Sequence, residues 1–224
     1  MAQDFFLHHE ILLLALHDAK GTPLTGMHTY AMSGAMLSEL LLYERIVAND
    51  DKNQTIAVVN EAPFGQPLLD EFLKMIVDSE KNLGSRAWIF KAVKIKDFLD
   101  KAASLLCTKG ILKKDERKLL FMFTQKVYPE VDGTFEDAIR QRMADVMFNE
   151  ANTPDERTAV LIAIAYHANL LAPNFPPMEL KQHKLRIKEL AQGQILAADA
   201  TKAAIDAVTT AVMTAAMIPI ITSA

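Results

Sequence analysis

The side chains best suited to metal binding or covalent chemistry are six histidines and one cysteine, Cys107. His8, His9 and Glu10 are adjacent, but neighbouring helical residues point about 100° apart and cannot chelate one ion together. His167 lies inside an apolar segment, where a solitary histidine is typical of a hydrogen-bonded core residue. Cys107 follows two leucines with no identifiable base, and such a thiol is usually inert. We therefore predict neither a metal site nor a nucleophile.

Motifs with a defined catalytic mechanism are missing from the sequence, which has no glycine-rich phosphate loop, nucleophile elbow or zinc-protease helix. The carboxylate pairs at residues 70–71 and 115–116 stand beside lysines or at expected turns, where charge mostly serves solvation. No acid and base pair can be nominated. We expect a protein that is not an enzyme and that uses no cofactor.

Composition and charge restrict the class of protein further. The 224 residues are 50% hydrophobic and 23% charged, a globular balance that allows a core without disulfides or metals. The formal net charge of -4 provides no global attraction to nucleic acid or to an anionic membrane, so such contacts need a local patch. One cysteine and an N-terminus without a secretory signal indicate a cytoplasmic protein. We expect no nucleic-acid partner.

Two apolar segments, residues 159–172 and 203–224, raise the question of a membrane span. The first is shorter than the roughly 20 residues that a bilayer requires. The second contains Asp206, several threonines and Pro219 and is rich in alanine. We predict that both are buried core helices.

The elements that would position these side chains are mainly helices. No linker or repeat divides the chain, which favours one domain over residues 1–224. Apolar periodicity, caps and breakers predict helices over residues 5–16, 29–46, 67–81, 88–93, 96–107, 134–148, 154–172 and 177–192, and from 194 onward. A β-rich run at residues 55–59 predicts a short strand. The predicted class is all-α: a single compact helical domain with a protruding β-hairpin and room for one small strand pair.

The predicted hairpin follows Gly110, where residues 110–123 have the layout of an apolar strand, a charged turn and a second apolar strand. The second strand carries too many consecutive apolar residues for a freely solvated ribbon. These residues are Leu119, Leu120, Phe121, Met122 and Phe123. A partner protomer, a lipid surface or the protein's own core would each cover them. A helix followed by a hairpin is also typical of a winged helix, but no basic recognition helix accompanies it.

A cluster of positive charge lies just ahead of the hairpin segment. Arg86, Lys91, Lys94 and Lys96 surround Trp88 within eleven residues. At about 1 kcal/mol per cation near an anionic surface, such a patch gives weak electrostatic docking. The alternative interpretation is a solvated helix face with Trp88 in the core.

Several segments, in order along the chain, carry a family resemblance. They include residues 10–21 (EILLLALHDAKG), 33–46 (SGAMLSELLLYERI), 68–76 (LLDEFLKMI), 109–123 (KGILKKDERKLLFMF), 128–143 (YPEVDGTFEDAIRQRM) and 155–171 (DERTAVLIAIAYHANLL). Together they resemble the Golgi phosphoprotein 3-like family. The resemblance implies a non-catalytic helical domain that binds phosphatidylinositol 4-phosphate at a membrane surface and self-associates through its hairpin. In eukaryotic members it also implies a protein cargo, which this sequence does not name.

The resemblance also implies which residues of this chain stand at the family's lipid head-group positions. The family's tryptophan falls at Leu24, its first arginine at Ser33, and its two later arginines at Lys96 and Leu99, so one cation of three remains. The chain begins almost at the common domain, as in the bacterial branch of the family. We predict a peripheral membrane-associating scaffold or adaptor for anionic lipid. The alternative is a soluble oligomeric interaction module with a decayed lipid pocket.

Overall fold

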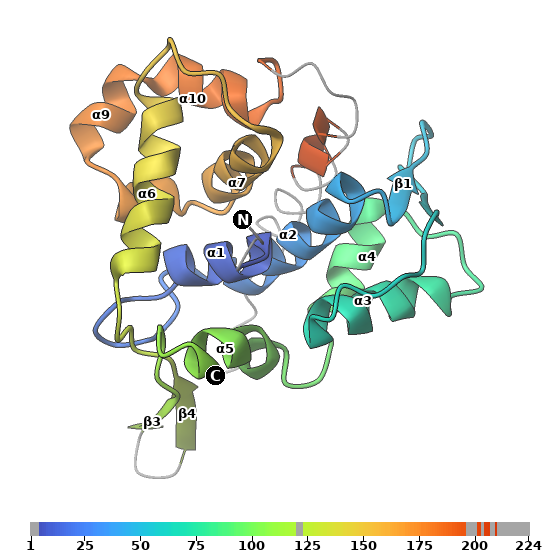
Figure 1. Ribbon diagram of the computed structural model, residues 1–224, viewed down its shortest axis with the longest axis horizontal. Coiled ribbons are helices and arrows are strands. Elements are labelled where there is room, and N and C mark those ends of the chain that lie inside the picture. Colours follow the sequence, from blue (N-terminus) through green and yellow to red (C-terminus); the bar gives the residue numbers. More distant parts are fainter. Residues whose placement is uncertain (1–4, 120–122, 196–200, 203, 207–208, 210–224) are drawn as a thin grey trace, which may run out of the picture.

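The computed structural model describes residues 5–119, 123–195, 201–202, 204–206 and 209. Within these residues the chain is mainly helical with two antiparallel strand pairs, so the predicted fold class is confirmed (Figure 1). The helices are α1 (Leu7–Ala15), α2 (His28–Leu42), α3 (Pro67–Val77), α4 (Ser85–Ala92), α5 (Phe98–Thr108), α6 (Thr134–Met147), α7 (Glu156–His167), α8 (Leu171–Asn174), α9 (Pro177–Gln182) and α10 (Lys184–Ala191). The strands are β1 (Ile46–Ala48), β2 (Ile56–Val58), β3 (Asp115–Leu119) and β4 (Phe123–Val127).

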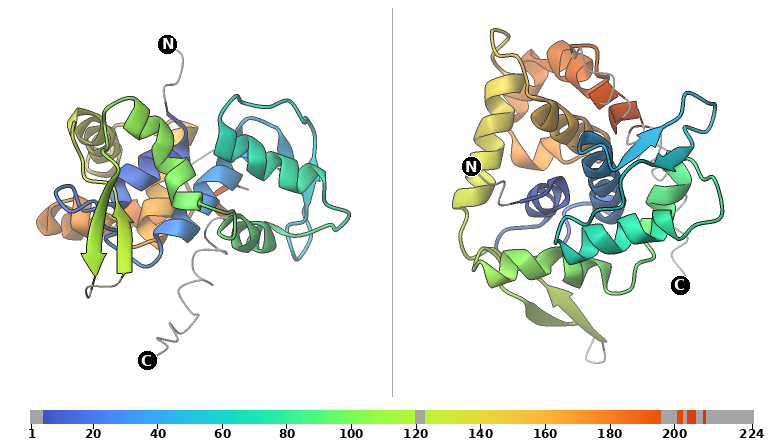
Figure 2. Two further views of the ribbon diagram at one scale, coloured as in Figure 1. Left: turned by 90° about the horizontal axis from the view of Figure 1, so that it is seen from below. Right: turned by 45° about the vertical axis from the view of Figure 1, so that its right-hand side comes forward.

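Helix α1 forms the centre of the molecule. All nine of its residues are buried, and it packs against α2, α5, α6 and α7. A helix that is buried on every side must be enclosed by others, and α7 meets the same condition with eight consecutive buried residues, Thr158–Ala165. The right-hand view of Figure 2 shows α1 nearly end-on, surrounded by the other helices.

The two segments that raised the question of a membrane span have different outcomes. Residues 159–165 are buried in α7, which confirms the prediction of a core helix there. Most of residues 203–224 lie outside the described part of the chain. Among the residues that are described, no helix combines the length and the apolar character needed to cross a bilayer.

The small pair β1–β2 stands at one end of α2. Ile46 faces Val58 and Ala48 faces Ile56 in an antiparallel register, which confirms the strand predicted near residue 56. The helix predicted over residues 29–46 ends earlier, at Leu42, because the left-handed backbone of Glu44 (φ 52°) ends the helical path and leads into β1. Figure 1 places this pair beside α3 and α4, on the side of the molecule away from α6.

The projecting pair β3–β4 exists, but its predicted composition was wrong. The charged residues expected to form a turn are the strand β3, and Asp115 pairs with Val127 across the ribbon. Figure 1 shows the pair extending from the helical body beyond α5, and residues 115–118 and 124–126 are exposed. A two-stranded ribbon that is open to solvent on both faces has no buried side to fill, so charged residues fit along it. Of the apolar residues predicted for this hairpin, Leu120, Phe121 and Met122 lie outside the described residues, as do the side chains of Leu119 and Phe123.

Helix boundaries near the C-terminal half also differ from the prediction. The helix predicted to begin at residue 154 begins at Glu156 instead, because the Asp155 carboxylate caps it by accepting the Thr158 N–H at 2.9 Å. The helix ends at His167 instead of continuing to Pro173, and Asn169 follows with a left-handed backbone (φ 57°). The single helix predicted over residues 177–192 is divided into α9 and α10 at His183.

Candidate functional site

The predicted cations form an exposed surface on and just after α4, here termed the cationic surface. It consists of Arg86, Lys91, Lys94 and Lys96, all of which are exposed. Within the described residues, no ion pair joins any of the four to a carboxylate. Their charge is therefore available to an external anion.

The burial of α4 explains why the cations face outward. Trp88, Ile89 and Ala92 are buried against neighbouring helices, so the remaining faces of this short helix carry the charged residues. The Trp88 ring meets Phe72 of α3 edge-on, with ring centroids 6.5 Å apart. The interpretation of Trp88 as a core residue is thus confirmed. The ammonium of Lys91 lies 4.8 Å from the Trp88 ring centroid, within the range of a cation–π interaction.

A surface hollow of about 470 Å³ adjoins the start of α4. It is lined by Asn53, Asn82, Leu83, Gly84, Arg86, Ala87 and Phe90. The Arg86 guanidinium lies 5.8 Å from the centroid of Phe90, and that ring also packs edge-on against Tyr30 of α2 at 5.2 Å. Aromatic contacts therefore hold one wall of the hollow in place.

The four positions that the family resemblance assigns to head-group binding differ in exposure and in charge. Ser33 is fully buried inside α2, and its hydroxyl donates to the Thr29 carbonyl at 2.8 Å. Leu24 is exposed in the loop before α2, where its N–H donates to the Ala15 carbonyl at 2.8 Å. Lys96 is exposed and belongs to the cationic surface, whereas Leu99 is half-buried. Of the family's three cationic positions, only the one at Lys96 presents a charge here.

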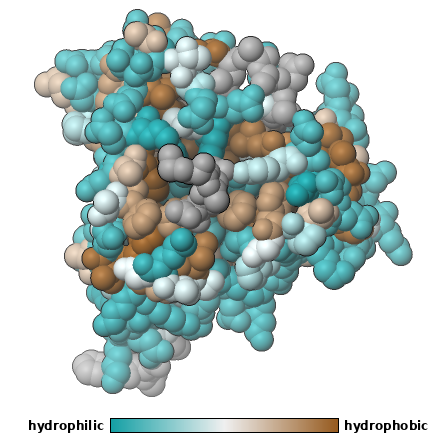
Figure 3. All heavy atoms as spheres, in the orientation of Figure 1, coloured by the Kyte–Doolittle hydropathy of each residue, from teal (hydrophilic) through white to brown (hydrophobic). Residues whose placement is uncertain are grey.

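The β3–β4 pair is attached to α5 by a polar cluster that sequence analysis missed. Asp100 of α5 forms ion pairs with Lys114, at 2.7 Å, and with Lys126. It also accepts a hydrogen bond from the Tyr128 hydroxyl. Burial raises the pKa of Asp100, but hydrogen bonds from the two lysines and the tyrosine outweigh it and hold this pKa well below its usual range. On the face shown in Figure 3, the projecting pair is largely hydrophilic. Residues so far apart in the sequence leave no local signal of their contact.

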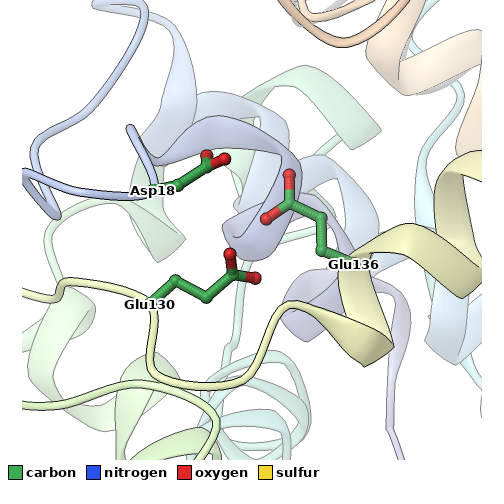
Figure 4. A group of neighbouring side chains, drawn as sticks. All are labelled: Asp18, Glu130 and Glu136. Atoms are coloured by element: carbon green, nitrogen blue, oxygen red, sulfur yellow. The ribbon is translucent and has the colours of Figure 1, made fainter.

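Three carboxylates converge where α6 begins. One oxygen from each of Asp18, Glu130 and Glu136 lies within 4.8 Å of the others, and Figure 4 shows the three side chains pointing toward one another. Burial is the main reason that the pKa of Glu136 rises to about 8. Oxygen ligands at this spacing suit a hard cation, but Arg140 already pairs with Glu136 and lies 3.8 Å from Asp18. The guanidinium neutralises part of the charge that a metal ion would otherwise balance. Sequence analysis did not bring these residues together.

A second buried network crosses the core. Glu39 of α2 accepts the Leu7 N–H at 2.5 Å and pairs with Arg157 of α7, which also donates to the Phe5 carbonyl at 2.9 Å. Glu10 of α1 pairs with Arg142 of α6 at 2.8 Å. Buried charges persist only when paired, so this network locks the start of α1 against α2, α6 and α7.

The histidine pair lies within this buried region. His8 and His9 are fully buried with ring centroids 4.0 Å apart, and the Phe6 N–H donates to Nδ1 of His9 at 3.1 Å. Burial lowers the pKa of His9 to about 3 and that of His8 well below its usual value. Elsewhere, burial lowers the pKa of His167 and raises that of the half-buried Cys107 thiol. The histidine pair is therefore a neutral part of the core at physiological pH.

Fold and surfaces together define a helical domain whose exposed features are a cationic surface, a surface hollow and a projecting strand pair. The sequence profile of the Golgi phosphoprotein 3 (GPP34) family matches residues 7–208, so the chain belongs to this family. The family predicted from the ordered sequence segments is thus confirmed.

Curated relatives include two fungal proteins named vacuolar protein sorting-associated protein 74. The chain is 28% identical to the one from Schizosaccharomyces pombe over 199 residues, which cover 74% of this chain and 58% of that protein. It is 29% identical to the one from Eremothecium gossypii over 161 residues, which cover 63% of this chain and 48% of that protein. The chain thus spans about half the length of these relatives.

Proposed function

We propose that this chain is a non-catalytic adaptor that associates peripherally with anionic membrane lipid, in the cytoplasm, through the cationic surface. The observation that carries the proposal is the group of four exposed cations without carboxylate partners among the described residues. Membership of the family supports the adaptor role. The buried position of the histidine pair favours a structural role over a catalytic one.

The strength of the cationic surface limits the mode of binding. Four cations at about 1 kcal/mol each supply roughly 4 kcal/mol, which corresponds to a dissociation constant of about 1 mM. Stable association therefore needs a second contact or several copies of the chain. We propose that the hairpin segment, residues 119–123, supplies that contact by inserting into the bilayer or by joining copies of the chain.

We propose anionic lipid in general as the ligand, rather than the family ligand phosphatidylinositol 4-phosphate in particular. Recognition of a phosphate group relies on convergent, often bidentate, charged hydrogen bonds. Ser33 is buried and Leu24 is apolar, so Lys96 alone retains the cationic character of the family's pocket. Charge density, more than head-group identity, should decide which vesicles are bound.

Vesicle sedimentation tests this function. Wild type should pellet with phosphatidylserine-containing vesicles at low salt, less at high salt, and little with phosphatidylcholine alone. The triple charge reversal Lys91→Glu, Lys94→Glu and Lys96→Glu should abolish that pelleting. An equal response of wild type and the triple variant would disprove docking through the cationic surface.

A matched control is available on another part of the molecule. Lys181, Lys184 and Lys188 are exposed on α9 and α10, and reversing these three charges changes the net charge by the same amount. That variant should still pellet with anionic vesicles. If both triple variants lose binding equally, the effect arises from net charge and the proposal is wrong.

The second candidate function is a soluble oligomeric interaction module. The net charge of -4 and the buried Ser33 favour it, because both weaken attraction to an anionic surface. It predicts a stable oligomer in light scattering that Phe121→Asp dissociates, together with no vesicle binding at any salt concentration. A monomeric wild type would exclude this candidate.

A further inference from the structure

A second surface hollow, of about 210 Å³, lies between the end of α7 and the helices α8 to α10. It is lined by Tyr166, Asn169, Leu171, Ala172, Leu180, Lys184 and Ile187. Sites for drug-sized ligands usually measure roughly 300–1,000 Å³, so this hollow is small for a cofactor. Its size and mainly aliphatic and aromatic lining suit one large apolar side chain.

Exposed residues of α9 and α10, the helices that supply one side of the hollow, combine positive charge with apolar character. Met178 and Leu185 are 66% and 70% exposed, although both are large hydrophobic residues. Lys184 and Lys188 stand one helical turn apart on α10, and Leu185 and Lys188 are also near neighbours on the helix surface. Lys184, Lys188 and Lys181 of α9 form no ion pair with a carboxylate in the parts of the chain that the structure describes.

The walls of the hollow are fixed before any partner binds. Arg186 of α10 donates to the carbonyls of Val146 at 2.8 Å and Asn152 at 2.7 Å, which ties α10 to α6 and the segment after it. Phe148 packs against Phe175 with ring centroids 6.0 Å apart, and this contact ties the end of α8 to α6. A preformed hollow requires little reorganisation, which favours binding.

We propose that this region, here termed the α7–α10 groove, binds an acidic amphipathic segment of a partner protein. A large apolar side chain of the partner occupies the hollow, and its carboxylates face Lys181, Lys184 and Lys188. Charge complementarity selects an acidic partner, and the concave apolar floor selects a protruding side chain over a flat surface. A bilayer presents neither feature at this scale.

The position of the groove suits an adaptor. Figure 1 places α9 and α10 at the end of the molecule away from β3 and β4. A membrane contact made through the projecting pair would therefore leave the groove open to a protein partner. The inference goes beyond the lipid contact proposed above and does not depend on it.

The test uses the full chain and a fluorescein-labelled synthetic peptide. The peptide carries leucine or phenylalanine at every third or fourth position and glutamate at most other positions, and a matched peptide has glutamine in place of glutamate. Fluorescence anisotropy should show that the glutamate peptide binds and that the glutamine peptide binds at least tenfold more weakly. Equal binding of the two peptides, or no binding of either, would overturn the proposal.

Two variants separate the hollow from its charged rim. Lys184→Glu with Lys188→Glu should weaken binding of the glutamate peptide about tenfold, because two attractive contacts become repulsive. Ala172→Phe should also weaken binding by filling the hollow, and circular dichroism would verify that this exposed position tolerates the change. The control Lys91→Glu, on the cationic surface, should leave peptide binding unchanged.

Vesicle sedimentation of the same variants distinguishes this inference from the lipid proposal. The groove variants should lose the peptide and keep phosphatidylserine vesicles. If instead Lys184→Glu with Lys188→Glu loses the vesicles and keeps the peptide, the groove is a membrane contact and the inference is wrong.

Discussion

The buried histidine pair should make the stability of this fold depend on pH. In the folded protein, burial keeps His8 and His9 neutral, and the pKa of His9 falls to about 3. In the unfolded chain both pKa values return to about 6.5. Below that pH the unfolded state binds more protons than the folded state. The stability that the pair contributes is therefore complete above about pH 6.5 and is lost progressively as the pH falls toward 3.

The magnitude follows from the proton linkage. Between about pH 7.5 and pH 5.5, each histidine that stays neutral in the fold lowers the unfolding free energy by roughly 1 to 2 kcal/mol, so the pair lowers it by roughly 3 kcal/mol. Glu136 acts in the opposite direction, because its folded pKa of about 8 lies above its unfolded value. Over the same interval, protonation of Glu136 adds stability, on the order of 2 kcal/mol. The two effects have opposite signs in wild type, so a comparison with variants is needed to separate them.

The assay compares wild type with His9→Gln, which retains an acceptor for the Phe6 N–H. Urea unfolding followed by circular dichroism gives the unfolding free energy of both proteins at several pH values. The variant should gain roughly 1 to 2 kcal/mol relative to wild type between about pH 7.5 and pH 5.5. Glu136→Gln should show a relative change of the opposite sign. A constant difference between wild type and His9→Gln would refute the reasoning, since it would require His9 to be protonated equally in both states.

Three further predictions concern stability. Gly84→Ala should lower the unfolding free energy by roughly 1–3 kcal/mol in urea titrations, because a Cβ there would lie 1.9 Å from the Asn53 carbonyl oxygen; an unchanged midpoint would contradict that close approach. Glu39→Gln should cost about 3 kcal/mol, because Glu39 is 0% and Arg157 14% exposed and the arginine would lose a close buried counter-ion, while its Glu10 partner lies farther away at 3.7 Å; a loss below about 1 kcal/mol would contradict this. Asp100→Asn should cost only about 1–2 kcal/mol overall but should speed amide hydrogen exchange in β3 and β4, and unchanged exchange would show that another contact holds the pair.

Sequence analysis predicted the helices better than the strand pairs because helical periodicity is a local signal. The apolar stripe of α3 and the apolar run at residues 11–15 of α1 identify buried faces within one or two turns. The β3–β4 pair was harder to predict, because a ribbon exposed on both faces shows no alternation of apolar and polar residues. The charged residues of β3 therefore had the appearance of a turn.

Helix ends show a similar limit. A threonine and a proline at residues 153–154 match the usual start of a helix, but Asp155 makes the capping bond. Several adjacent residues can serve as caps, and the packing of the helix decides among them. The carboxylate pair at residues 70–71 was likewise interpreted as solvating charge, whereas Asp70 accepts the N–H groups of Phe64 and Gly65 and holds the loop before α3.

The sequence by itself determined the family, the mainly helical class and the presence of four neighbouring cations, because these depend on composition, periodicity and ordered local segments. Tertiary structure decided which charges remain available. Packing placed Ser33 in the core and left Lys96 exposed. It also brought Asp18 and Glu136 together, and it formed the α7–α10 groove by packing α10 against α7. The geometry of these contacts depends on how whole helices pack against one another, which no local pattern of residues encodes.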